Sequence, residues 1–362
     1  MKQSATNITI QGNALKISIS GIISVRTVDR VLMQRLEDIN PEACLKIREL
    51  ILDLKAVRSI TPAAAISLVC LCAEVTSGKM KDIAKPVKIY CNRPPEHVLS
   101  YLMTLGFYTQ LSTKAGCGDY EDLVHREVEI KERALRKKKQ NASKQRMNSD
   151  ERSVVWPLDT IPCKETLPGS KDFENACQQF INNAYDNLEG ILSSPSFNFS
   201  GSDMAEFFTA NGELYENIFE HSNSWGLCTL HARRDQGTTV CYHDIGIGIK
   251  ESINTSPKVG KEINRFDTDY DAIVWALVEG HSSKDGRNGR GLNIVEEYVL
   301  TRSGYIELRS GQSLFYKKRG DKPGQKAWRH EKVPFFPGTQ INFFIPATQR
   351  YMMGTKDGYD KT

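Results

Sequence analysis

Glu213 and Asn217 are the first candidates for a functional site. They stand four positions apart in a stretch with helical character, so one helix face would present a carboxylate and a carboxamide together, beside the apolar stripe of Leu214 and Ile218. An Asn carbonyl oxygen can complete the octahedral shell of a Mg²⁺ that is otherwise held by water and phosphates. A Glu one turn earlier can take a proton from a water or hydroxyl group that attacks a γ-phosphate.

A second patch of candidate residues begins at Asp244. The alternating segment 238–243 predicts a strand, and this strand runs directly into Asp244, Gly246 and Gly248. A carboxylate only accepts hydrogen bonds, so Asp244 would suit the exocyclic amine of adenine and would reject the carbonyl group of guanine. The two glycines allow positive φ and close approach of the backbone to a ligand.

A third patch combines glycines with the start of a helix. Gly289, Gly291 and Leu292 precede the amphipathic run 294–299, which predicts a helix. Glycines at a helix start leave backbone amides free to point at phosphate oxygens. The three patches together therefore predict a site for a nucleotide.

Residues 171–346 resemble the Bergerat-fold ATPases, a family that includes histidine kinases, Hsp90 chaperones, MutL, type II topoisomerases and bacterial anti-sigma serine kinases. Its motifs, in order, are Glu-x-x-x-Asn, Asp-x-Gly-x-Gly and Gly-x-Gly-Leu, and the three patches match them in the same order. A late Gly-Thr pair followed by alternating apolar residues also fits, at Gly338 and Thr339.

The resemblance implies ATP and Mg²⁺ as ligands and gives the matching residues their roles. It makes Glu213 the catalytic base, Asn217 the Mg²⁺ ligand and Asp244 the reader of adenine. It also implies a lid over ATP, at whose end Ser282, Ser283 and Lys284 would contact phosphates. The remaining nucleotide-binding residues that it implies are Gly246, Gly248, Gly289, Gly291, Leu292 and Thr339.

Other nucleotide-binding motifs fit less well. An isolated Asp-x-Gly-x-Gly also occurs in ordinary hairpin turns, so the inference depends on four motifs in family order. A Rossmann fingerprint would need its third glycine where Glu251 stands. The chain contains no Gly-x-x-x-x-Gly-Lys-Ser/Thr string, which excludes a P-loop.

Composition bounds the class of protein. The chain has 362 residues, of which 40% are hydrophobic and 25% charged, with a net charge of +4, so two globular domains with ordinary cores are expected. No apolar signal segment opens it, and the longest apolar run, 62–75, is too short to cross a bilayer. Nine cysteines without a Cys-x-x-Cys pair favour buried thiols over zinc. We expect a cytoplasmic protein that does not span a membrane.

The N-terminal region alternates strand and helix patterns. The expected strands are 7–11, 14–20, 49–54 and 87–91, and the expected helices are 24–39, 62–77 and 95–105. This order resembles a STAS domain, the fold of anti-sigma factor antagonists, most strongly over 49–73.

One position departs from the STAS pattern. STAS phosphoacceptors place Asp-Ser at the start of the central helix, whereas this chain has Thr61-Pro62 there. Proline has no hydroxyl group, and Thr61 is expected to cap the helix, although Thr61 or Ser59 remains an alternative phosphoacceptor. We therefore expect a module that docks a protein partner or forms a homodimer.

Residues 116–155 change in character. The run 131–146 is basic, compatible with a helix and nearly free of acidic residues, and it contains no aromatic residue that could stack on bases. It could bind nucleic acid or an acidic partner, but a solvated linker is the favoured interpretation, and nucleic acid is not an expected partner.

The C-terminal region adds helices at 172–192 and 270–279 and closing strands at 305–309, 313–317 and 340–345. The predicted fold is thus α/β, with a STAS-like mixed sheet and helices over 1–115 and a two-layer α/β sandwich of the Bergerat type over 156–348. The linker of 116–155 joins them, and 349–362 is expected to be a disordered tail.

Three functions follow from this interpretation. The first is an ATP- and Mg²⁺-binding regulatory protein of the histidine-kinase-like and anti-sigma-kinase class, which hydrolyses ATP or phosphorylates a protein serine. The second is a non-catalytic switch in which ATP binding changes the surface seen by a partner. The third, ranked last because the sequence lacks the transducer domain of such proteins, is an ATP-gated clamp on DNA.

Overall fold

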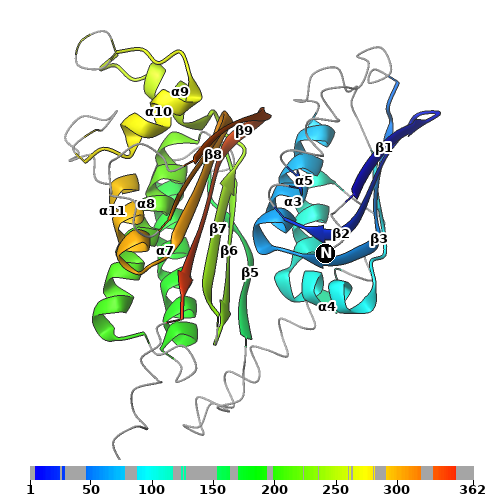
Figure 1. Cartoon of the computed structure of the whole chain (residues 1–362), viewed down its shortest axis with the longest axis horizontal. Helices are drawn as coiled ribbons and strands as arrows, with labels where there is room; N and C mark the ends of the chain where they lie inside the picture. Colours follow the sequence, from blue (N-terminus) through cyan, green and yellow to red (C-terminus); the bar gives the residue numbers. More distant parts are fainter. Residues whose placement is uncertain are drawn as a thin grey trace, which may run out of the picture.

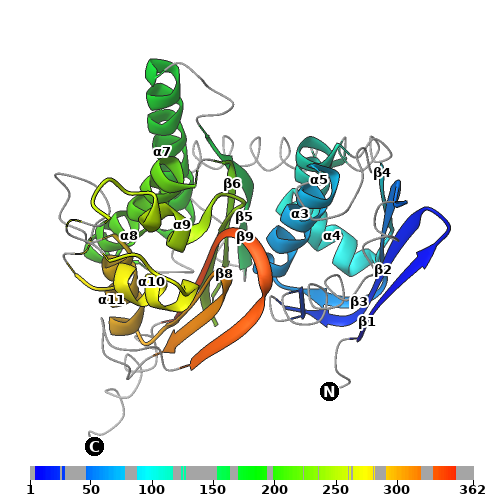
Figure 2. The same ribbon diagram turned by 90° about the horizontal axis from the view of Figure 1, so that it is seen from above.

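The computed structural model is a mixed α/β protein with two sheets. The residues it describes are 5–24, 27–28, 46–77, 88–116, 124, 126–127, 153–163, 170–193, 199–222, 224–234, 236–259, 261, 264–279, 281, 291–318 and 329–347. An N-terminal mixed sheet of four strands and a C-terminal antiparallel sheet of five strands are each accompanied by helices, as predicted. Figures 1 and 2 show that some of these helices lie between the two sheets.

The N-terminal sheet confirms the four strands expected there. Its strands, in spatial order, are β1 (Ala5–Gln11), β2 (Ala14–Ile23), β3 (Glu49–Ile60) and β4 (Lys88–Asn92). The first two form an antiparallel hairpin that turns at Gly12, and the other pairs are parallel. The helix expected at 24–39 falls almost wholly outside the described residues.

Three helices pack on this sheet. They are α3 (Pro62–Ser77), α4 (Glu96–Leu105) and α5 (Phe107–Ala115). Thr61 caps α3 as expected, because its hydroxyl oxygen accepts a hydrogen bond from the amide of Ala64 at 3.3 Å. The sequence analysis missed α5, since Gly106, with a φ of 76°, ends α4 and begins the next helix at once.

The C-terminal sheet is wholly antiparallel. Its strands, in spatial order, are β5 (Ser153–Ile161), β6 (Gly226–Arg233), β7 (Gly237–Asp244), β9 (Arg329–Pro346) and β8 (Tyr305–Lys318). The two strands expected at 305–309 and 313–317 are one strand, β8, whose register with β9 shifts at Gly311. Glycine with a φ of 56° accommodates this irregularity without ending the strand.

Helices cover one face of the C-terminal sheet. They are α7 (Ser170–Leu192), α8 (Gly201–His221) and α11 (Gly291–Thr301), and the shorter α9 (Gly248–Asn254) and α10 (Asp269–Ala276) lie near one end of β8. In Figure 1 these helices stand on the side of the sheet away from the N-terminal domain. No helix in the described ranges combines the length and apolar character needed to cross a bilayer.

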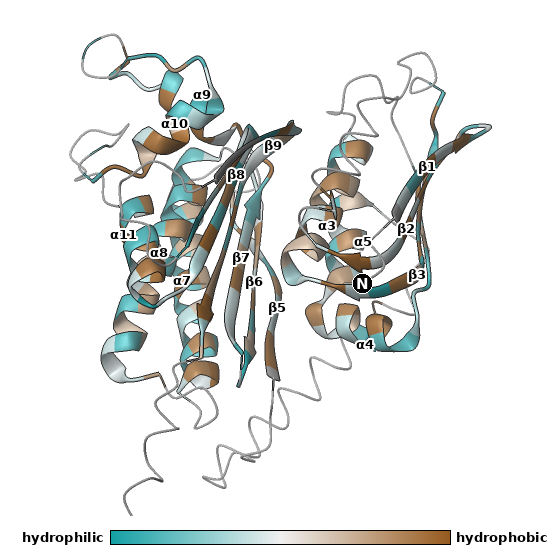
Figure 3. Ribbon diagram, in the orientation of Figure 1, coloured by the Kyte–Doolittle hydropathy of each residue, from teal (hydrophilic) through white to brown (hydrophobic). Residues whose placement is uncertain are grey.

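Helix α3 lies between the two sheets. Every residue from Pro62 to Val75 is buried, because α5 and β4 pack on the helix within the N-terminal domain and β6 and β7 pack on it from the C-terminal sheet. Figure 3 shows mostly apolar colouring around α3, whereas polar and apolar residues alternate on α8. A helix that is apolar all round is typical of such a central position.

Candidate functional site

Helix α8 carries the first motif. A reciprocal cap starts it, in which the Asp203 amide donates to the Ser200 hydroxyl at 3.1 Å and the Asp203 carboxylate accepts from the Ser200 amide at 3.2 Å. The apolar stripe that includes Leu214 faces the core and is buried. Glu213 and Asn217 lie beside that stripe and are half-buried.

The first and third motifs are in contact. A methyl group built on Gly291, the first residue of α11, would lie 2.9 Å from Glu213 Oε2 and 3.3 Å from Asn217 Nδ2. Any larger residue would therefore displace the carboxylate or the carboxamide. Leu292, the next residue, packs on the core beneath α8 and α11. The structure thus brings Glu213, Asn217 and the glycine-led helix together.

The Asn217 side chain has an unused polar atom at this contact. Its Nδ2 atom is buried and has no hydrogen-bond partner within the part of the chain that the structure describes. Burying an unpaired polar group costs about 1 to 3 kcal/mol. A side-chain amide with no partner among the described residues, beside a carboxylate and a glycine at a helix start, suits a Mg²⁺-bound phosphate whose oxygens and waters would complete its bonding.

Asp244 ends β7 and is 4% exposed. Its Oδ1 atom accepts a hydrogen bond from the Gly246 amide at 2.9 Å, and the amide of Thr339 also bonds to this carboxylate. Burial raises the pKa of Asp244 from 3.8 to about 7, against the opposing effect of these backbone donors. Thr339 therefore adjoins the second motif, as the late Gly-Thr match implied.

The second motif packs against the end of α8. A side chain at Gly246 would overlap the Ser222 carbonyl group, which also accepts a hydrogen bond from the Ile247 amide at 3.1 Å. Gly248 has the positive φ expected of it, 75°, and a methyl group there would lie 2.9 Å from the Ser310 hydroxyl. Gly246 does not have a positive φ, and close backbone packing is what requires glycine there.

Gly226 connects the first two motifs. A methyl group at this glycine would lie 3.2 Å from Ile218 Cγ2 and 3.5 Å from Asp244 Cβ. Ile218 directly follows Asn217 on α8, so one glycine separates the helix of the first motif from the carboxylate of the second. The end of α8 from Glu213 and its C-cap Ser222 are thus bordered in turn by the third motif and by the second.

Ser222 and Ser310 support the second motif, and the sequence analysis missed both. The Ser310 hydroxyl accepts from the Ile249 amide at 2.9 Å and donates to the Gly338 carbonyl at 3.4 Å. This hydroxyl therefore links α9 to β9 at Gly338, the residue before Thr339. A serine some sixty positions from the motif carries no local sequence signal for such a role.

Four implied phosphate contacts, Ser282, Ser283, Lys284 and Gly289, lie outside the described residues. The structure describes both sides of this segment. His281 stacks on Trp275 and bonds to the carbonyl group of that residue, and Asn293 of α11 donates to the Leu277 carbonyl at 3.2 Å. These contacts hold His281 and Asn293 against α10 and the residue that follows it.

Comparisons with known proteins add no relative. No protein-family model matches the chain, and no curated protein matches it. The geometry of the site therefore carries the functional argument.

Proposed function

We propose that this protein binds ATP and Mg²⁺ and acts as a cytoplasmic regulator of the histidine-kinase-like and anti-sigma-kinase class, either hydrolysing ATP or phosphorylating a partner protein. The observation that carries the proposal is the packing of Gly291 against both Glu213 and Asn217. A polar pair on one helix and a glycine-led helix from a distant part of the chain meet there, which is the arrangement that phosphate binding requires.

Each residue has a task in this proposal. Bound Mg²⁺ and ATP supply the transferable phosphoryl group and the charge that polarises it. The Asn217 carboxamide offers the hard oxygen that holds the metal, and the Glu213 carboxylate, on the same helix face, accepts a proton from the attacking hydroxyl or water. Asp244 would accept a hydrogen bond from the adenine amine, and the amide of Gly291, at the start of α11, would be available to a phosphate oxygen.

Glu213→Gln tests the catalytic part of the proposal. The substitution keeps the size of the side chain and removes the base, so release of labelled phosphate or labelling of a partner should fall by about 100-fold or more while ATP affinity stays within about twofold. Glu297→Gln, which removes an exposed carboxylate from α11, should change neither quantity. An unchanged rate in Glu213→Gln would refute the assigned role.

A non-catalytic switch is the second candidate, and one contact favours it. Ile245, between Asp244 and Gly246 of the second motif, belongs to the core that the N-terminal domain forms with the back of the C-terminal sheet. Nucleotide binding at this motif is therefore mechanically connected to the docked domain. Wild-type protein that binds ATP but neither releases phosphate nor labels a protein would favour the switch over the enzyme.

A further inference from the structure

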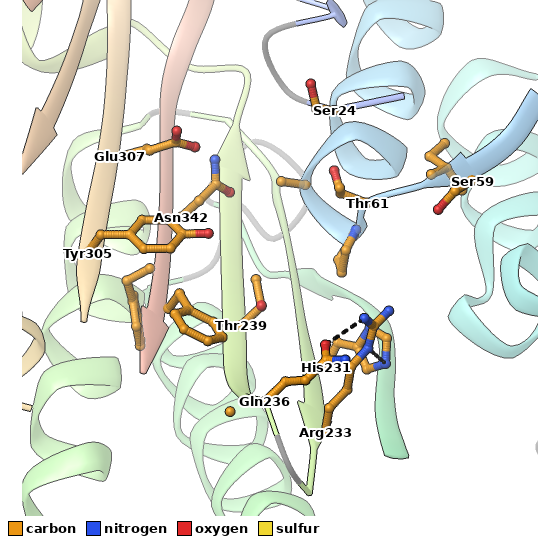
Figure 4. Close-up of a pocket in the computed structure, with 16 residues that line it drawn as sticks. Ser24, Ser59, Thr61, His231, Arg233, Gln236, Thr239, Tyr305, Glu307 and Asn342 are labelled. Atoms are coloured by element: carbon orange, nitrogen blue, oxygen red, sulfur yellow. Dashed lines mark hydrogen bonds between the residues drawn. The ribbon is translucent and has the colours of Figure 1, made fainter. Parts of the chain in front are cut away.

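A cavity of about 370 Å³ lies between the start of α3 and the face of the C-terminal sheet opposite α8. Both domains line it, with Thr61 and Pro62 on one side and Arg233, Tyr305, Glu307 and Asn342 on the other (Figure 4). It shares no residue with the three motifs. Its volume would hold about ten waters or a molecule the size of an amino acid.

One wall of this cavity attracts anions. The first turn of α3 presents the positive end of a 16-residue helix, behind its cap at Thr61. The Arg233 guanidinium donates to Gln236 Oε1 at 2.9 Å and to His231 Nε2 at 3.3 Å. Burial and the nearby Arg233 lower the pKa of His231 to about 4, so both of these partners are neutral at pH 7. Within the described ranges, Arg233 forms no ion pair with a carboxylate.

The opposite wall accepts hydrogen bonds. Asn342 is 5% exposed, and its Oδ1 atom has no partner among the residues that the structure describes. Glu307 is its neighbour across the β8–β9 pair and places a second acceptor at the same wall. A buried carbonyl oxygen that stays unpaired is costly, and a donor in the cavity would remove that cost.

We propose that this cavity binds a small zwitterion, whose anionic group lies against Arg233 and the start of α3 and whose ammonium group lies against Asn342 and Glu307. One wall favours negative charge and the other favours hydrogen-bond donors or positive charge. A simple anion or a simple amine could therefore bind only one of the two walls. Because α3 and strands of the C-terminal sheet both line the cavity, the ligand bridges the two domains. This site is independent of the proposed ATP function.

Calorimetric titration of the full chain tests the site with L-glutamate and O-phospho-L-serine as probes. Acetate, inorganic phosphate and ethylamine serve as the isolated halves. We expect at least one zwitterion to bind ten-fold or more tightly than either of its halves. Arg233→Ala should weaken that binding ten-fold or more, whereas Arg234→Ala, which removes an exposed cation outside the cavity, should leave it unchanged.

Asn342→Leu separates the two walls, since it should abolish the advantage of the zwitterion over its anionic half. ATP affinity, measured in the same samples, should be unaffected by Arg233→Ala and reports that the protein is folded. If neither zwitterion gives binding heat at concentrations up to about 10 mM, the proposal is overturned. Equal affinity for zwitterion and isolated anion, or binding that survives Arg233→Ala, would overturn it as well.

Discussion

The two faces of the C-terminal sheet differ in what covers them. On one face, α8 meets α11 at Gly291, beside half-buried polar side chains and the Asn217 Nδ2 atom, which has no hydrogen-bond partner among the described residues. On the other face, α3 is buried along almost its whole length, and the contacts with the sheet are mostly apolar. Gln340 adds a polar contact there, donating to the Ser67 hydroxyl at 2.9 Å. The first face thus carries polar groups between its helices, whereas the second mainly packs against the N-terminal domain.

The two faces meet at the end of β7. Asp244 lies beside the helices of the first face, while Ile245, the next residue, packs into the core of the second. Burial raises the pKa of Cys70 on α3, and the charge of Asp244 on the far side raises it further. The N-terminal domain therefore contacts the second motif from the other face of the sheet, so we expect a substitution on either face to alter the residues on the other.

Gly338→Ala should have the largest effect of the changes considered. Gly338 has a φ of 80°, and a methyl group there would overlap the Asp244 carbonyl group. Strain and overlap with the backbone should lower the free energy of unfolding by about 4 kcal/mol or more. Gly190→Ala, where a methyl group meets nothing within 4 Å, should instead be neutral or stabilising by about 1 kcal/mol. Urea unfolding of the pair would contradict the tight-packing argument if both behaved alike.

Asp244→Asn should change the pH dependence of stability. The folded carboxyl keeps its proton up to about pH 7, whereas the unfolded one loses it near 3.8, so stability contributed by this group falls as pH rises across that window. The full difference is roughly 4 kcal/mol, at 1.36 kcal/mol for each pKa unit. The variant should match the wild type near pH 4 and be more stable at pH 8. A difference between the two proteins that does not vary with pH would contradict the raised pKa of Asp244.

Ile245→Ala tests whether the second motif depends on the docked domain. Ile245 is 6% exposed in the shared core, so its truncation should cost about 3 kcal/mol and weaken ATP binding. Ile247→Ala, two positions on in the same motif and 39% exposed, should cost less than about 1 kcal/mol. Equal losses of stability in the two variants would mean that the motif does not depend on the N-terminal domain.

Gln340→Leu should have the smallest effect. It removes the hydrogen bonds from Gln340 Nε2 to the Ser67 hydroxyl at 2.9 Å and to the Ala63 carbonyl at 3.4 Å, but it also removes the Oε1 atom of Gln340, which is buried without a partner in the described structure. These two terms oppose each other, so stability should stay within about 1 kcal/mol of the wild type. A much larger loss in thermal unfolding would show that this polar contact, rather than apolar packing, holds the domains together.

Sequence patterns predicted most of the helices and strands better than the residues at which one ends and the next begins. The fold class, the strands of the N-terminal sheet, β7 to β9 and the motif helices follow from periodicity, whereas β5 and β6 were not predicted. The helix α5 was missed because a single glycine serves two helices, and β8 was divided because a bulge looks like a turn. The support from Ser222 and Ser310 depends on tertiary contact and leaves no local pattern.

The site shows the same limit. The sequence was enough to select Glu213, Asn217, Asp244 and the motif glycines as candidates, because their types suit the chemistry of phosphate and adenine. The burial that raises the pKa of Asp244 could not be read from neighbouring residues, because β9 and α8 supply it from other parts of the chain. Neither could the contact of the second motif with the N-terminal core.

Calorimetric titration with ATP and GTP, each with and without Mg²⁺, tests most directly whether three distant segments surround one nucleotide. The account predicts one ATP bound per wild-type chain and a preference for ATP over GTP that Asp244→Asn reduces. It also predicts a gain in affinity from Mg²⁺ that Asn217→Ala removes. Failure of the wild type to bind ATP, or binding that neither variant alters, would contradict the account.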